Sequence, residues 1–99
     1  VVGELPDSVA QISAPTVNVV VTGMDVEVTW SVVDSASGYS LYYAPYPYEG
    51  AHTIRSIDMN EANRLSVTLY PNASFYVAVK AYHSHGSSEF SNVEWLQVE

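Results

Sequence analysis

The segment His83-Ser84-His85 holds the side chains of this sequence that are best suited to chemistry. A serine near a histidine is the pair that nucleophilic catalysis uses, together with an acid that orients the histidine. Such a nucleophile also needs a rigid turn to hold it, and no Gly-x-Ser-x-Gly turn occurs in the chain. No order of serine, histidine and acid stands out either, so we expect no catalytic residue and no enzyme activity.

The same two histidines are the weak candidates for a metal site. Together with a carboxylate from Asp34, Asp58 or Glu61, the imidazoles of His83 and His85 could bind Zn²⁺. Their spacing is not diagnostic, because alternate side chains of an irregular loop need not converge. The chain has no cysteine, which excludes thiolate sites. We therefore expect no metal and no cofactor, and a weak metal-binding loop domain is only the second alternative function.

Just before these histidines, residues 75–82 alternate in type. A period of two predicts a strand with one buried face. The apolar set faces the core in this interpretation, because a shift by one residue would turn three apolar side chains towards water. The set predicted to be buried is Phe75, Val77, Val79 and Ala81, and the set predicted to point outward is Tyr76, Ala78, Lys80 and Tyr82.

The rest of the chain reads as further short strands separated by turn residues, over 16–21, 26–30, 39–44, 52–57, 65–69 and 92–98. Seven short strands with frequent turn signals predict an all-β sandwich. The facing of the last strand is open, because the core could receive either Trp95 or Leu96 with their alternate neighbours.

Composition narrows the class of protein. The 99 residues are 47% hydrophobic and 14% charged, which fits a globular chain rather than a disordered one. Residues 1–13 read as a linker or lead-in, and residues 14–99 as one domain. Lys and Arg number 3 against 11 Asp and Glu, so the formal net charge is −8. That excess of negative charge argues against nucleic acid and anionic membranes as partners. No apolar run of the sequence approaches the roughly 20 residues that span a bilayer.

In order and spacing, these residues resemble a fibronectin type III domain over residues 14–98. The resemblance rests on Pro15, Trp30, Gly38-Tyr39-x-Leu41-x-Tyr43, Leu69-x-Pro71, the alternation from Phe75 to Ala81, and the ending Tyr82, Gly86-Ser87 and Ser91. Two segments are similar to bacterial extracellular members of the family: Tyr-Ser-Leu-Tyr-Tyr-Ala-Pro and Phe-Tyr-Val-Ala-Val-Lys-Ala-Tyr. The chain departs from the family at Phe75, where a corner tyrosine usually bonds back to the turn, so a hydrogen bond of about 1 kcal/mol is missing.

The resemblance implies an immunoglobulin-like sandwich of seven antiparallel strands, in which strands A, B and E pack against strands C′, C, F and G. It also implies a non-catalytic interaction or spacer module of a larger multidomain protein. Such a protein is exported, to the cell surface, the extracellular space or the periplasm. The sequence begins without Met, and we expect it to be a piece of such a protein that is monomeric in isolation.

The topology that the resemblance implies makes Tyr42 a neighbour of the strand over 75–82. Tyr42, Tyr76, Lys80 and Tyr82 would then form one outward patch. We expect this patch to bind a protein or an adjacent domain of the same chain, because aromatic residues are enriched at interfaces. Tyrosine rings also stack on sugars, so an accessory carbohydrate-binding domain for polysaccharide is the first alternative. A secondary surface, which we expect to seal the rim at the opposite end, comprises Tyr46, Tyr48 and Tyr70.

Overall fold

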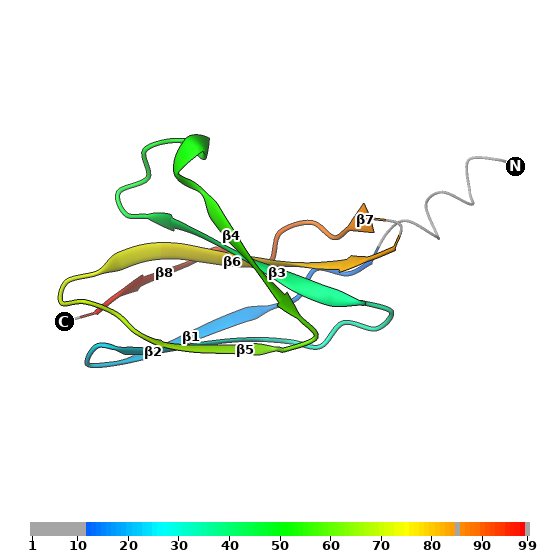
Figure 1. Cartoon of the computed structure of the whole chain (residues 1–99), viewed down its shortest axis with the longest axis horizontal. Helices are drawn as coiled ribbons and strands as arrows, with labels where there is room; N and C mark the ends of the chain where they lie inside the picture. The colour runs from blue at the N-terminus through cyan, green and yellow to red at the C-terminus, as the bar shows by residue number, and fades with distance from the viewer. Residues whose placement is uncertain (1–11, 85, 99) are drawn as a thin grey trace, which may run out of the picture.

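The computed structural model of the chain describes residues 12–84 and 86–98. Two antiparallel sheets pack face to face, which confirms the sandwich predicted from the sequence. One sheet holds three strands in the order β1-β2-β5 and forms the lower layer in Figure 1. Its strands are β1 (Val17–Thr22), β2 (Asp25–Trp30) and β5 (Arg64–Thr68).

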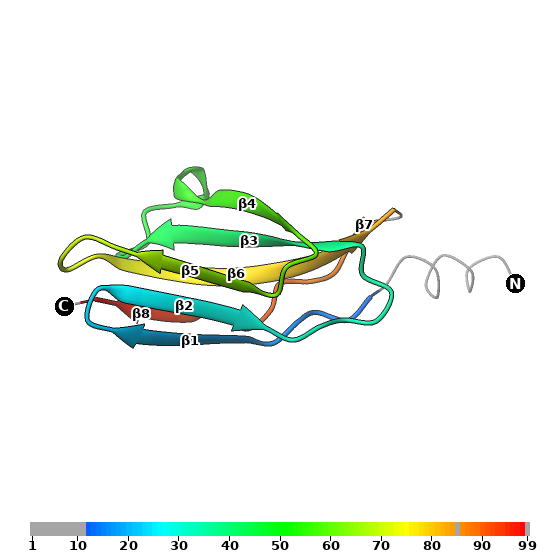
Figure 2. The same cartoon turned by 60° about the horizontal axis from the view of Figure 1, so that its bottom comes forward.

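In the other sheet, β3 runs between β4 and β6 (Figure 2), and β6 also pairs with the short strands β7 and β8. These strands are β3 (Gly38–Pro45), β4 (Arg55–Asn60), β6 (Ser74–His83), β7 (Gly86–Ser87) and β8 (Glu94–Gln97). The topology is A-B-E against C′-C-F-G, as expected. The last strand is split into β7 and β8, so the described part of the chain has eight strands instead of the expected seven. Nothing helical in that part has the length and hydropathy of a membrane span.

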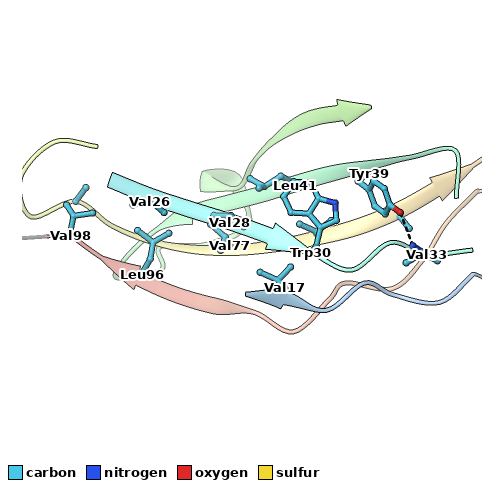
Figure 3. Close-up of a cluster of buried hydrophobic side chains, with 13 residues drawn as sticks. Val17, Val26, Val28, Trp30, Val33, Tyr39, Leu41, Val77, Leu96 and Val98 are labelled. Carbon is cyan, nitrogen blue, oxygen red and sulfur yellow. Dashed lines mark hydrogen bonds between the residues drawn. The ribbon is translucent and has the colours of Figure 1, made fainter. Parts of the chain in front are cut away.

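Alternation in the sequence places one face of each inner strand in the core. In β2, Val26, Val28 and Trp30 are each at most 3% exposed. A two-residue turn joins β1 to β2, and Gly23 has a φ of +64° there, which other residues adopt rarely. Figure 3 shows side chains of both sheets meeting in this core, including Leu41 of β3, which is 1% exposed.

The facing predicted for β6 is confirmed. Phe75 is partly buried and packs against the core, and the fully buried residues of the same face are Val77, Val79 and Ala81. The facing of β8 follows from its register on β6. Leu96 pairs with Phe75 and is 4% exposed, whereas Trp95 points away from the core and is 51% exposed.

The segment around β4 differs from the expectation. The sequence predicts a strand over 52–57 and a polar connection after it, whereas the structure has a short 3-10 helix, η1 (Ala51–Thr53), and then β4. Every residue of β4 except Met59 is exposed. An edge strand open to water does not need alternating polarity, so residues 58–60 read as part of a polar connection.

Tyr39 ties the loop after β2 to the core. Its hydroxyl accepts a hydrogen bond from the backbone N–H of Val33 at 2.9 Å, drawn dashed in Figure 3. Its ring centroid lies 6.2 Å from that of Trp30, at a tilt of 59°. The buried hydroxyl thus has its partner, as buried polar groups require.

Candidate interaction surface

The outward face of β3 and β6 carries large and small side chains in alternation. Tyr42 pairs with Ala78 across the two strands, and Ala44 pairs with Tyr76. Each ring therefore stands beside an alanine. The two alanines, 5% and 6% exposed, form the floor of a hollow between the rings. The register of the two strands creates this shape, because it sets which side chains are neighbours across the sheet.

Two segments outside β3 and β6 complete the walls of the hollow. The chain between β7 and β8 contributes Phe90 and Val93, which are 45% and 62% exposed. The loop between β3 and β4, which projects away from the three-stranded sheet in Figure 1, contributes Tyr48 and Ile54. The hollow has a volume of about 380 Å³. We call it the aromatic bowl, and its side chains are Tyr42, Ala44, Tyr48, Ile54, Tyr76, Ala78, Phe90 and Val93.

A row of rings extends the surface beyond Tyr76. The ring centroid of Tyr46 lies 5.6 Å from that of Tyr76 and 5.2 Å from that of Trp95. The indole N–H of Trp95 donates a hydrogen bond to Ser74 Oγ at 2.8 Å, which holds the indole beside β6. We call Tyr46, Tyr76 and Trp95 the aromatic row.

The sequence predicts a separate surface for Tyr46, Tyr48 and Tyr70, and the structure arranges them differently. Tyr46 belongs to the aromatic row and Tyr48 lines the bowl. The backbone N–H of Tyr46 donates to the carbonyl of Ser74 at 3.1 Å, so the pairing with β6 continues past the end of β3 and keeps the outward facing. Tyr70 is 62% exposed, and its ring meets that of Phe75 edge to face at 6.4 Å.

Lys80, the one lysine of the sequence, lies against the rings at one end of the bowl. Its Nζ is 4.3 Å from the ring centroid of Phe90 and 5.7 Å from that of Tyr42. The two rings meet edge to face at 5.0 Å. An ammonium group within about 6 Å of a ring face is attracted to it. Lys80 therefore stabilises this wall of the bowl.

Tyr82, the fourth residue predicted for partner binding, does not line the bowl. Its hydroxyl donates to Asp58 Oδ1 at 2.8 Å, which links β6 to the edge strand β4 across β3. Its ring covers Gly38, where a Cβ would lie 2.8 Å from the carbonyl oxygen of Asn60 and closer still to Tyr82. Of the four predicted residues, the structure brings three together around the bowl and gives Tyr82 contacts within the sheet.

Hydrogen bonds shift the pKa of both members of the Asp58–Tyr82 pair. The backbone N–H of Asn60, 2.9 Å from Asp58 Oδ1, and then the Tyr82 hydroxyl lower the pKa of Asp58 below its ordinary value of 3.8. The pKa of Tyr82 is raised above its ordinary value of 10.0, first because its hydroxyl donates to the Asp58 carboxylate. The folded state thus favours the ionised carboxyl and the neutral phenol.

The Tyr82→Phe variant is expected to lose stability at neutral pH and to approach the wild type at both extremes. A lowered pKa at Asp58 contributes stability above the ordinary value of 3.8 that is lost as the pH falls through the folded-state pKa. A raised pKa at Tyr82 contributes stability below the ordinary value of 10.0 that is lost as the pH rises through the folded-state pKa. The stability difference should therefore be flat from about pH 5 to pH 9, as measured by urea unfolding.

The matched control for this prediction is Tyr76→Phe, on the same strand and face. The Tyr76 hydroxyl has no hydrogen-bond partner among the described residues, so its removal should leave the pH profile of stability unchanged. A Tyr82→Phe effect that is as large at strongly acidic pH as at neutral pH would contradict the assigned hydrogen bond.

Several surface residues that the sequence does not predict lie outside regular strands. Phe90 lies between β7 and β8, and Ile54 lies between η1 and β4, where no period indicates a facing. Trp95 lies in β8, and its partner across the sheet, Tyr76, faces the same way. Pairing with a strand of known facing was the signal that could have identified it.

Neither His52 nor His83 is among the residues that line the bowl. His83 ends β6, and His85 lies outside the described residues. Among residues 12–84 and 86–98, no three His, Cys, Asp or Glu side chains gather closely enough to hold a metal ion.

Comparison with known proteins identifies the fold. No protein-family model matches the sequence, and no curated protein resembles it closely enough in sequence to match. The crystal structure of the chicken CNTN1 FN1–FN3 domains matches with a TM-score of 0.73 and 22% identity over 87% of this chain, and the chain spans only 30% of that protein. The fn3 domain of the human collagen alpha-1(XX) chain matches with a TM-score of 0.70 and 19% identity, over 88% of this chain and 85% of that one. At such identities the likeness concerns shape: this chain has the fibronectin type III fold.

Proposed function

We propose that this chain is a non-catalytic interaction module of a larger exported multidomain protein. It binds a protein, either a separate partner or a neighbouring domain, through the aromatic bowl and the aromatic row. The observation that carries the proposal is the run of exposed aromatic side chains around one hollow. Domains of this fold are typically extracellular binding or spacer modules, which supports a place at the cell surface or outside the cell.

A spacer alone does not account for this surface. Tyr48, Phe90, Val93 and Trp95 are between 45% and 62% exposed, although large apolar side chains are favoured when they are covered. The hydroxyls of Tyr42, Tyr48 and Tyr76 have no hydrogen-bond partner among the described residues. Apolar rings with free polar tips are what protein interfaces are enriched in.

The shape of the surface favours a protein over a polysaccharide. The rings of the aromatic row are tilted by 57° and 41° to one another, so they form no flat platform for a chain of sugar rings. The side chains that line the bowl are apolar apart from the tyrosine hydroxyls. Sugar hydroxyls would lose their hydrogen bonds to water there and find few replacements.

Site-specific photo-cross-linking in the full-length parent protein tests the proposal. A benzoyl-phenylalanine at position 48, in the bowl, is compared with one at position 20 on the outward face of the three-stranded sheet. Tyr48 is 52% exposed and Val20 is 51% exposed, so the two positions are matched in access. We expect position 48 alone to cross-link to a protein, and we expect the added change Tyr76→Ala to weaken that product.

Other results would overturn the proposal. Equal cross-linking at both positions, or none at position 48, removes the bowl as the binding surface. Polysaccharide binding that Tyr76→Ala abolishes, without a protein cross-link, would identify a carbohydrate-binding domain instead. Hydrolytic turnover by the chain that His83→Ala abolishes would contradict a non-catalytic module.

A further inference from the structure

We infer that the aromatic bowl receives one large apolar side chain, presented by a Lys- and Arg-rich segment of the partner protein. The inference rests on the proposed function and adds the chemistry of the partner. Two independent features of the molecule lead to it: the apolar hollow with rings beside it, and the negative charge of the chain.

The bowl has side chains standing on both flanks of its floor. Tyr42 and Tyr76 stand at diagonal corners of the floor, Phe90 and Val93 come from the side of β8, and Tyr48 and Ile54 come from the side of β4. A hollow with an alanine floor and rings beside it accepts one side chain end-on. Partner side chains that enter such desolvated pockets contribute most of the affinity of many interfaces.

The chemistry of the lining selects an apolar side chain. The floor consists of the methyl groups of Ala44 and Ala78, and Ile54 and Val93 add further apolar surface. A polar side chain would give up hydrogen bonds to water without a replacement on this floor. The volume of about 380 Å³ leaves room for a side chain as large as tryptophan.

The charges of this chain indicate which residues of the partner flank that apolar side chain. All three cationic side chains are engaged within the chain: Lys80 lies over the Phe90 ring, Arg55 donates to the carbonyl of His52 at 3.1 Å, and Arg64 pairs with Glu27 at 2.9 Å.

Two carboxylates next in sequence to bowl residues are not engaged in this way. Glu49 follows Tyr48 in the sequence and Glu89 precedes Phe90, and both are exposed. Neither carboxylate forms an ion pair with another described residue. With a formal net charge of −8, the chain attracts cationic segments and repels a second copy of itself. A partner segment rich in Lys and Arg that presents one large apolar side chain complements both the apolar bowl and the negative charge of the chain.

Short synthetic peptides titrated into the isotope-labelled chain test this inference by NMR. One peptide has a tryptophan between lysines and arginines, the second has alanine in place of the tryptophan, and the third has glutamates in place of the basic residues. We expect the first to bind with saturable shifts at the amides of Ala44, Ala78 and Val93, more weakly at high salt. The other two should bind at least about tenfold more weakly.

Two variants locate the binding. Ala78→Leu fills the floor and should weaken the first peptide by about tenfold or more, whereas Ser66→Leu adds the same bulk to the outward face of the other sheet and should have no effect. Tyr76→Ala removes a wall, and it replaces Ala78→Leu if that variant does not fold.

Three results would overturn the inference: no binding by the first peptide, equal binding by the alanine or glutamate peptide, or binding that neither bowl variant weakens. If the cross-link at position 48 forms and the peptides fail, the proposed function stands and the partner chemistry is wrong. If both fail, the bowl is not a binding site.

Discussion

The Leu41→Ala variant is expected to unfold at a much lower urea concentration than the wild type, with a loss of about 2–5 kcal/mol in the free energy of unfolding. Leu41 is 1% exposed and lies at the middle of β3, paired with Val79 of β6 and with Ile57 of β4. Truncation removes apolar contacts and leaves a cavity that close-packed neighbours fill only in part. Chemical unfolding followed by circular dichroism measures the effect.

The control is Ile57→Ala, at the paired position on β4. Ile57 is 40% exposed, so its truncation removes less buried surface and should cost clearly less. Equal losses for the two variants would contradict the position of β3 at the centre of its sheet. The comparison also bears on the bowl, because the strand that Leu41 anchors carries Tyr42 and Ala44 on its outward face.

The fold could be predicted because its strongest signals are local. In β2 and β6, apolar residues recur at every second position, and the structure buries the predicted faces. A shift of one residue would expose the whole set, so the pattern allows one arrangement. Alternation predicts the facing even at position 75, where the chain departs from the family. Phe75 faces the core although it lacks the hydroxyl of a corner tyrosine.

Edges and interruptions of the sheet could not be predicted in the same way. In β4 the backbone pairs with β3 while the side chains lie in water, so nothing in its sequence needs to alternate. Across the break between β7 and β8, serine hydroxyls accept hydrogen bonds from backbone N–H groups of β6. A serine whose hydroxyl bonds to a neighbouring strand and a serine that points into solvent are the same residue type. Residue type alone therefore does not distinguish the two roles.

The candidate surface was predictable to the extent that strand facing determines it. Tyr42 and Tyr76 follow from alternation, and the structure places both in the bowl. The hollow itself needed the register, because only the pairing of Ala78 with Tyr42 and of Ala44 with Tyr76 sets alanines beside rings. Phe90 carried no signal, since its segment is neither strand nor helix.

Two buried serines carry the ladder across the break in the last strand. The backbone N–H of Ser91 donates to the Val79 carbonyl at 2.8 Å, and Ser91 Oγ accepts from the Val79 N–H at 2.8 Å. Ser88 does the same with Ala81, at 2.7 Å and 3.0 Å. Each hydroxyl replaces a backbone carbonyl that the irregular chain does not supply. Phe90 lies between these two serines, so its place over the bowl depends on them.

The double variant Ser88→Ala/Ser91→Ala is therefore expected to lose stability and binding together. Each change leaves one buried N–H of β6 without an acceptor, at about 1–3 kcal/mol apiece, so unfolding should show a loss of about 2–6 kcal/mol. Ser87→Ala, an exposed serine of β7, should stay within about 0.5 kcal/mol of the wild type. Below its unfolding transition the double variant should also bind the basic tryptophan peptide more weakly, because Phe90 is no longer held by the ladder on both sides.

Wild-type stability in the double variant would contradict the two hydrogen bonds. Full loss of stability with unchanged peptide affinity would mean that Lys80 and Tyr42 hold Phe90 without help from the serines.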